Sequence, residues 1–244
     1  KEAIILRRDT HVDQLADKLK EPRVRMVLQP ILTGADTLDT AESDDTQYLI
    51  DLGLIRRAGA RLEIANAIYR EVIPRELSQQ AQLYFGIRQE PAWYIGPDGK
   101  LMMNKLLEGF QQFYRENAEV WLDRLLYKEA GPQLLMQAFL QRIVNGGGRI
   151  DREYGLGRRR TDLLIVWNHP GGVQRAVIEL KMLRGSLEKT LADGLAQTRD
   201  YMDRVGTADG HLVIFNPDLA APPASRFFQR SETAGGAPIQ VWGM

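Results

Sequence analysis

The chain has 244 residues, of which 44% are hydrophobic and 26% charged, and its 32 basic and 32 acidic residues give no net charge at pH 7. This composition is typical of a soluble globular protein with one large domain or two smaller ones. Because the charge is balanced, nucleic-acid affinity would have to come from local basic patches. The absence of cysteine excludes disulfides and thiolate metal sites and fits a cytoplasmic protein.

Three absences bound the class of protein further. The sequence has no run of about 18 apolar residues and no basic-then-apolar leader, so we expect no membrane segment. It has neither GxxxxGKS nor GxxxxGKT, and therefore no P-loop of its own. Because the chain begins with Lys1 rather than Met, we expect it to be a fragment of a longer protein.

The N-terminal region, residues 1–78, begins with two predicted helices. Apolar residues recur at helical spacing over residues 11–32. The segment 44–53 opens with Asp44 and Asp45 as candidate N-caps and closes on a glycine, which is a common helix stop.

A hairpin and a third helix complete this region. The segment 54–65 alternates and has turn residues at Ala58-Gly59, which predicts a β-hairpin. Asn66 is the candidate N-cap of the helix that follows. Three helices and a hairpin are the parts of a winged helix, in which the hairpin would be the wing.

Residues 79–117 are expected to connect two domains and to end in an amphipathic helix over 101–117. The second domain, residues 118–244, begins with a helix that is broken or kinked near Gly131-Pro132. Strands are predicted at 149–155, 161–167, 173–182 and 210–217, with a long helix over 186–206 before the last strand. That strand is apolar throughout and should be central. The order helix–strand–strand–strand–helix–strand predicts an α/β or α+β domain with a mixed sheet.

Two acids and a lysine are expected on one face of this sheet. If the hairpin is symmetric about Pro170-Gly171, Asp162 lies opposite Glu179, with Cβ atoms roughly 5 Å apart. Lys181 shares the face of Glu179 because strand side chains alternate. A bulge would shift this pairing by one residue.

Paired carboxylates repel one another unless a positive charge lies between them. A hard divalent cation such as Mg²⁺ binds carboxylate and backbone oxygens, can hold a phosphate oxygen and lowers the pKa of bound water. Lys181 would add a positive charge near the scissile phosphate, and the three residues would form a phosphodiesterase site. The alternative is a salt bridge of Lys181 with Glu179 or Asp162 at a sheet edge.

Two further features favour the site. A basic loop precedes Asp162 and could contact phosphates; its arginines are Arg152, Arg158, Arg159 and Arg160. Gln197 and Tyr201 lie four residues apart on one helix face, where they could orient water or bind the nucleic-acid backbone. The alternatives are a solvated basic run and a half-buried helix face.

Together these residues resemble the PD-(D/E)XK nuclease superfamily. The resemblance rests on Asp162 in `GRRRTD`, on Glu179 and Lys181 in `IELK`, and on the Gln197-xxx-Tyr201 pattern. The chain is similar to the nuclease domains that follow an ATPase module and a winged helix in bacterial and archaeal AAA-like ATPase proteins. An ATPase module would then lie upstream of Lys1.

The resemblance implies a restriction-endonuclease-like mixed sheet flanked by helices and Mg²⁺-dependent cleavage of DNA, with Mn²⁺ as a substitute. Asp162, Glu179 and the Leu180 carbonyl would be metal ligands, Lys181 the catalytic lysine, and Gln197 and Tyr201 accessory residues. The family often adds an acid from its first core helix. Here we choose Glu129, with Glu153 as the other candidate.

The winged helix adds a weaker indication of DNA contact. Its expected recognition helix starts with Asp44 and Asp45, which phosphate would repel. Arg56 and Arg57 on the wing, together with Arg61, are better placed for backbone contact. We therefore favour packing or docking against the ATPase over sequence reading. Two other hypotheses stay open: a catalytically silent nuclease-fold module that binds DNA or a partner, and an operator-reading regulator. The oligomeric state also stays open, a homo-oligomer included.

Overall fold

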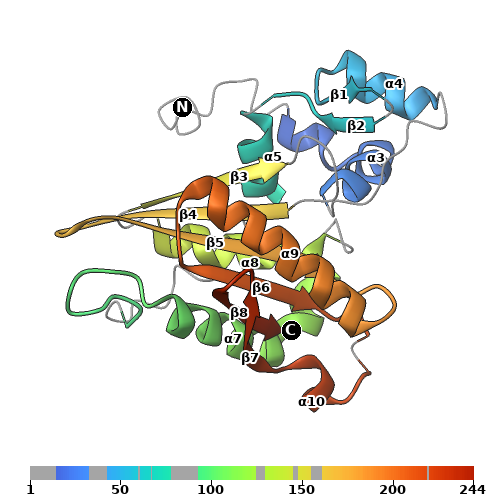
Figure 1. The fold of residues 1–244 in the computed structure, drawn as a ribbon. Helices are drawn as coiled ribbons and strands as arrows, with labels where there is room; N and C mark the ends of the chain where they lie inside the picture. The colour runs from blue at the N-terminus through green and yellow to red at the C-terminus, as the bar shows by residue number, and fades with distance from the viewer. Residues whose placement is uncertain are drawn as a thin grey trace.

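The computed structural model describes residues 15–32, 43–59, 61–66, 68–77, 93–124, 130–144, 148–154, 161–218 and 220–244. Within these ranges the chain forms a small helical N-terminal domain with a two-stranded sheet, and a larger α+β domain around a six-stranded mixed sheet (Figure 1). No helix in the described ranges combines the length and the apolar character that crossing a membrane requires.

The N-terminal domain contains the predicted hairpin and second and third helices. Its elements are α3 (Pro22–Leu32), α4 (Asp44–Asp51), β1 (Ile55–Ala58), β2 (Arg61–Ile64) and α5 (Tyr69–Leu77). The segment predicted as one helix over residues 11–32 is interrupted by a turn at residues 19–21, and its second part is α3. The hairpin pairs Ala58 with Arg61, so its turn begins at Gly59, one residue later than expected. Gly59 has φ 65°, a left-handed conformation that glycine adopts without a steric penalty.

Side-chain caps set the starts of two of these helices. The N-cap of α4 is Ser43, whose hydroxyl accepts a hydrogen bond from Thr46 N at 3.1 Å, rather than Asp44 or Asp45. The two aspartates instead lie in the first helical turn, where their negative charge interacts favourably with the helix dipole. The predicted cap Asn66 is confirmed, because its Oδ1 accepts hydrogen bonds from the backbone N of the two residues at 68 and 69.

The larger domain has three long helices around one sheet. The helices are α7 (Met103–Arg124), α8 (Gly131–Val144) and α9 (Leu187–Val205), with a short α10 (Pro223–Arg226). The strands are β3 (Gly148–Tyr154), β4 (Thr161–His169), β5 (Gly172–Met182), β6 (Gly210–Phe215), β7 (Gln229–Ala234) and β8 (Ala237–Gly243). The predicted order helix–strand–strand–strand–helix–strand is confirmed as α8-β3-β4-β5-α9-β6.

The sheet order is β3-β4-β5-β6-β8-β7. The pairs β3–β4, β4–β5 and β7–β8 are antiparallel, whereas β5–β6 and β6–β8 are parallel. The prediction that β6 is central is confirmed, because β6 lies between β5 and β8 and all six of its residues are buried. The hairpin β7–β8 was not predicted.

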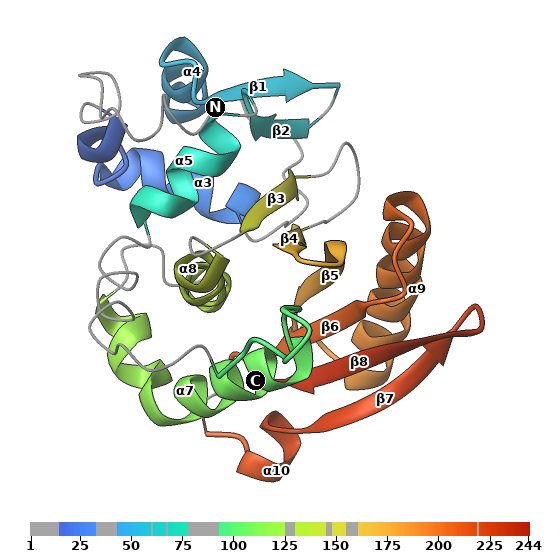
Figure 2. The ribbon, with the colours of Figure 1, turned by 90° about the vertical axis from the view of Figure 1, so that its left-hand side faces the viewer.

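Helices cover the two faces of the sheet (Figure 2): α9 lies on one face, and α7 and α8 lie on the other. The face under α7 and α8 contributes Ile178, Val213 and Trp242 to a large apolar cluster. The face under α9 contributes Val177, Leu212 and Val241 to a second cluster. These alternating positions show which residues of each strand share a face.

Two findings bear on the expected domain limits. The helix α7 continues through residue 117, where we expected the connecting segment to end, and its Phe110 and Tyr114 belong to the main apolar cluster of the larger domain. Ala130 and Leu134, at the start of α8, pack instead with the apolar core of the N-terminal domain. The start of α8 therefore belongs to the apolar core of the N-terminal domain, and the rest of α8 to that of the larger domain.

Candidate functional site

The predicted pairing of Asp162 with Glu179 is confirmed. The strands β4 and β5 are joined by the two-residue turn Pro170-Gly171, and His169 pairs with Gly172 on either side of it. The pairing between these two strands continues to the acidic residues without a bulge. A two-residue hairpin turn therefore determines which residue of β5 faces Asp162.

The row of paired residues extends to a third acidic position. Glu153 on β3 pairs with Asp162, and Glu179 on β5 pairs with Leu212 on β6. Three acidic positions thus lie side by side on β3, β4 and β5. For Glu153 and Asp162 the structure describes the backbone position and not the side chain.

Glu179 and Lys181 occupy the face of β5 that α9 covers. Val177, two residues earlier, packs in the cluster under α9. Ile178 and Leu180 pack in the cluster under α7 and α8. The side chain of Leu180 therefore lies on the other face, and only its backbone could take part in a site beside Glu179.

The side chains of Glu179, Lys181 and Gln197 form one polar chain. The Glu179 side chain is fully buried, and that of Lys181 is 13% exposed. Lys181 Nζ makes an ion pair with Glu179 Oε1 and donates a hydrogen bond to Gln197 Oε1 at 2.6 Å. The ammonium thus lies between a carboxylate on its own strand and an amide oxygen on α9.

Burial makes this arrangement costly to form and costly to break. Moving a carboxylate and an ammonium out of water carries a desolvation penalty of several kcal/mol per ion, which their mutual attraction only partly repays. Val177, the preceding position of β5 on this face, packs with apolar side chains under α9. Two packed apolar side chains in place of both Glu179 and Lys181 would satisfy the fold about as well. The charge therefore points to chemistry rather than to packing.

Gln197 and Tyr201 lie in different surroundings although they are one helical turn apart. Gln197 contacts Lys181, as described above. Tyr201 is 1% exposed and packs with Met202 and Leu212 in the cluster between α9 and the sheet. The Arg204 guanidinium lies 5.2 Å from the centre of the Tyr201 ring. The structure thus brings Gln197 to the acidic row and places Tyr201 in the core.

The structure describes some of the predicted basic residues and not others. Arg152 lies on β3 opposite Leu163, and its side chain is not described. Arg158, Arg159, Arg160 and the candidate acid Glu129 lie outside the described residues. In the β1–β2 hairpin, Arg57 is exposed and Arg56 makes an ion pair with Glu63. A nitrogen of Arg70 also lies 3.7 Å from Glu63 Oε1.

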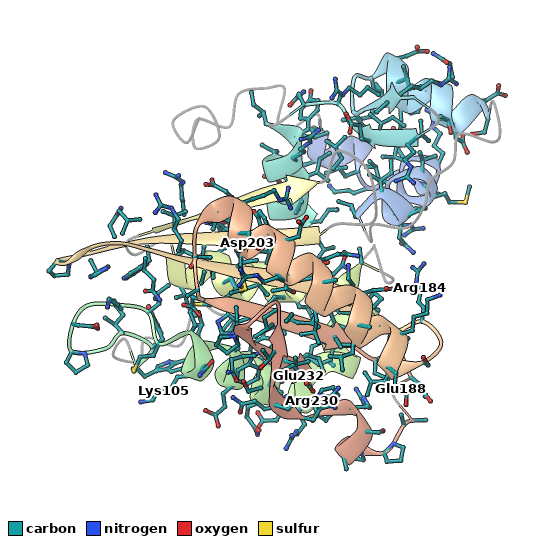
Figure 3. The ribbon with its side chains drawn as sticks, in the orientation of Figure 1. Lys105, Arg184, Glu188, Asp203, Arg230 and Glu232 are labelled. Carbon is teal, nitrogen blue, oxygen red and sulfur yellow. The ribbon has the colours of Figure 1, made fainter. Side chains whose placement is uncertain are left out.

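The basic residue Arg184 was not predicted as part of the site, because it is isolated and does not belong to a run of charge. Arg184 is exposed in the short loop that joins β5 to α9, three residues after Lys181. Figure 3 shows Arg184 and Glu188 where α9 begins, and Asp203 toward the other end of the helix. The position of Arg184 could have been inferred from its place directly after the strand that carries Glu179.

Oxygen donors characterise the acidic row as a candidate metal centre. Among the side chains that the structure describes, no three His, Cys, Asp or Glu residues come together in a way that could hold a metal ion. That set does not contain the side chains of Glu153 and Asp162. Carboxylates on adjacent strands and the backbone of Leu180 are hard oxygen donors, the ligand class that Mg²⁺ and Mn²⁺ prefer. The donor set therefore fits such an ion.

Comparisons with protein-family models, with curated proteins and with solved structures find no match for this chain.

Proposed function

We propose that this chain is a metal-dependent nuclease module that hydrolyses DNA phosphodiester bonds. The observation that carries the proposal is the row of Glu153, Asp162 and Glu179 on three adjacent strands, with Lys181 beside it. The element order α8-β3-β4-β5-α9-β6 supports a restriction-endonuclease-like domain, in line with the resemblance to PD-(D/E)XK nucleases.

In this proposal Asp162, Glu179 and the Leu180 carbonyl would hold a Mg²⁺ ion, and Glu153 or Glu129 would add a further carboxylate. A bound divalent ion polarises the phosphate and lowers the pKa of a coordinated water. Lys181 presents a fixed positive charge beside Glu179, where negative charge on the phosphate oxygens grows in the transition state. Gln197 holds the Lys181 ammonium in place through its 2.6 Å hydrogen bond. Tyr201 keeps α9 packed on the sheet.

Substrate contact would come from basic side chains around the row. Arg184 follows β5 along the chain, and Arg158, Arg159 and Arg160 precede Asp162. Arg152 pairs with Leu163 and therefore lies on the sheet face that α7 and α8 cover, opposite the acidic row. Arg56 and Arg57 would make weaker contacts, because Arg56 already pairs with Glu63. Such contacts to phosphates make binding fall steeply with salt.

The test is cleavage of plasmid and of single-stranded DNA with Mg²⁺ or Mn²⁺. We expect Asp162→Ala, Glu179→Ala and Lys181→Ala each to reduce the rate by at least about 100-fold, the loss typical of removing one transition-state stabiliser. Asp203→Asn is the matched control, because Asp203 pairs with Arg199 on the exposed side of α9. If the protein cleaves DNA and both Asp162→Ala and Lys181→Ala stay fully active, the site assignment is wrong.

A second candidate function is a silent module that binds DNA or a partner. It is favoured by the ion pair between Lys181 and Glu179, which satisfies both charges without a metal. Salt-dependent DNA binding without cleavage under any metal would support it. An upstream ATPase module is part of both proposals, and the acidic start of α4 favours docking against that module over contact with phosphate.

A further inference from the structure

The helix α9 approaches the sheet closely at Gly194. A Cβ atom built at Gly194 would lie 2.7 Å from Leu212 Cδ1 and 2.8 Å from Cδ2, well inside van der Waals contact. One turn later, Thr198 Oγ1 donates a hydrogen bond to the Gly194 carbonyl at 2.8 Å, and both residues are buried. The absence of a side chain at Gly194 therefore sets how closely α9 approaches β6.

This close approach occurs beside the polar chain of the candidate site. Leu212, which Gly194 contacts, is the paired neighbour of Glu179 in the sheet. Gln197 follows Gly194 by three residues, so both lie on the same stretch of α9. The hydrogen bond from Lys181 to Gln197 spans the gap between helix and sheet at 2.6 Å.

We propose that Gly194 is a positioning residue that brings Gln197 within hydrogen-bond reach of Lys181. Leu212 is fully buried in the cluster under α9 and, unlike a methionine, is branched next to its end. With Leu212 held in place, a methyl group at Gly194 moves α9 about 1 Å away from β6 to restore ordinary carbon–carbon contact. The same shift would lengthen the Lys181–Gln197 contact to about 3.6 Å, which no longer counts as a hydrogen bond. The catalytic consequence rests on the proposed nuclease function, whereas the geometric consequence does not.

A purely structural role for Gly194 makes a different prediction. Glycine in a helix interior is less favourable than alanine by about 1 kcal/mol, so its presence indicates that something excludes a side chain. If close packing against Leu212 were the only reason for a glycine at this position, Gly194→Ala would lower the stability and leave the activity unchanged. If Gly194 acts through Gln197, the variant loses activity only where Gln197 is present.

The experiment is a set of four variants assayed for DNA cleavage and for thermal unfolding. We expect Gly194→Ala to lower kcat about 10- to 100-fold with little change in KM, as for a misplacement of about 1 Å. In a Gln197→Ala background the same substitution should have no further effect on kcat. The double variant Gly194→Ala with Leu212→Val should regain most of the activity, because it removes a carbon where the methyl group is added.

The matched control is Gly210, the first residue of β6, which faces α9 near the end of the helix. A Cβ at Gly210 would lie 2.2 Å from the sulfur of Met202, which is five residues beyond Gln197. Gly210→Ala therefore also inserts a methyl group between α9 and β6. We expect it to lower the melting temperature while leaving kcat within about threefold of the parent, because the flexible methionine end can move aside.

Three results would overturn the proposal: full activity in Gly194→Ala, an equal loss in the Gln197→Ala background, or no recovery with Leu212→Val. If the unmodified protein cleaves no DNA, the proposed function fails, and the crystal structure of Gly194→Ala decides the positioning claim by itself. A Lys181 Nζ–Gln197 Oε1 distance beyond 3.5 Å supports the claim, and an unchanged distance of about 2.6 Å refutes it.

Discussion

Acid–base clusters occur in two regions of this molecule, and their surroundings differ. In the N-terminal domain, Glu21 accepts hydrogen bonds from Lys18 at 2.7 Å and from Arg23 at 3.0 Å, and its side chain is 29% exposed. In the sheet, Glu179 is fully buried and pairs with Lys181. Water can replace any partner of Glu21, whereas a broken contact at Glu179 leaves a charge in an apolar region.

The two regions differ in what an ion pair contributes to the stability of the fold. Exposed ion pairs contribute about 0–1 kcal/mol and can be exchanged freely. A buried pair is often no better than two packed apolar side chains. The pair in β5 is therefore poorly explained by stability, which supports a role in chemistry.

The largest expected effect is at Lys181. We expect Lys181→Met to lower the free energy of unfolding by about 3 kcal/mol, because it removes the ammonium that pairs with the buried Glu179 carboxylate. The double variant Glu179→Met with Lys181→Met should recover most of this loss, since both charges are then gone. Urea denaturation of the three proteins measures the effect. Equal stability of the single and double variants would contradict the claim that breaking the buried pair costs more than replacing both of its members.

Glu63 in the β1–β2 hairpin offers an intermediate case. It is 9% exposed and lies beside Arg56 and Arg70, whose side chains are partly exposed. We expect Glu63→Ala to lower the free energy of unfolding by roughly 2 kcal/mol, between the limits for exposed and buried pairs. Urea denaturation beside Lys181→Met ranks the two. A larger loss of stability for Glu63→Ala than for Lys181→Met would show that burial does not determine how much each ion pair contributes.

Each of the two regions has a helix whose N-cap is a serine. Ser43 accepts a hydrogen bond from Thr46 N at the start of α4, and Ser186 accepts one from Lys189 N at the start of α9. Replacing either serine with alanine should lower stability by about 1 kcal/mol, and aspartate should restore it. Thermal unfolding of the alanine and aspartate variants tests this. Unequal losses would show that the regions differ in more than burial.

The smallest effect is expected at Glu21 and depends on pH. Hydrogen bonds from Lys18 and Arg23 lower the pKa of Glu21 from 4.5 to about 2. Because the pKa is lower in the folded state, the stabilisation is complete above pH 4.5 and disappears as the pH falls toward 2. The difference in melting temperature between the parent and Glu21→Gln should therefore shrink between pH 6 and pH 3. A constant difference would contradict this assignment.

Local chemistry in the sequence predicted much of the fold. The turn residues Pro170-Gly171 joined two apolar strands and so led to the correct pairing of Asp162 with Glu179. Asn66 was recognisable as a cap because its side chain satisfies free backbone N–H groups. The uniform apolar character of β6 indicated burial on both faces.

Other features depend on packing that a linear pattern does not display. The strand β7 is mostly polar and lies at a sheet edge, so it lacks the apolar alternation of a strand. Its hairpin could have been suspected from Gly235-Gly236, both at positive φ. The bond between Lys181 and Gln197 was not predicted, because it depends on how closely α9 approaches the sheet. The arginines 158–160 and Glu129 remain predictions.

The tight turn between β4 and β5 also has a consequence for the order of folding. A hairpin closed by two residues brings Asp162 and Glu179 together through local contacts, and such hairpins form in about 1–10 μs. Pairing of β5 with β6 must wait for the crossover through α9, a slower step because it closes a long loop. We therefore expect the two acidic positions to meet early in folding, before the helix that carries Gln197 has docked.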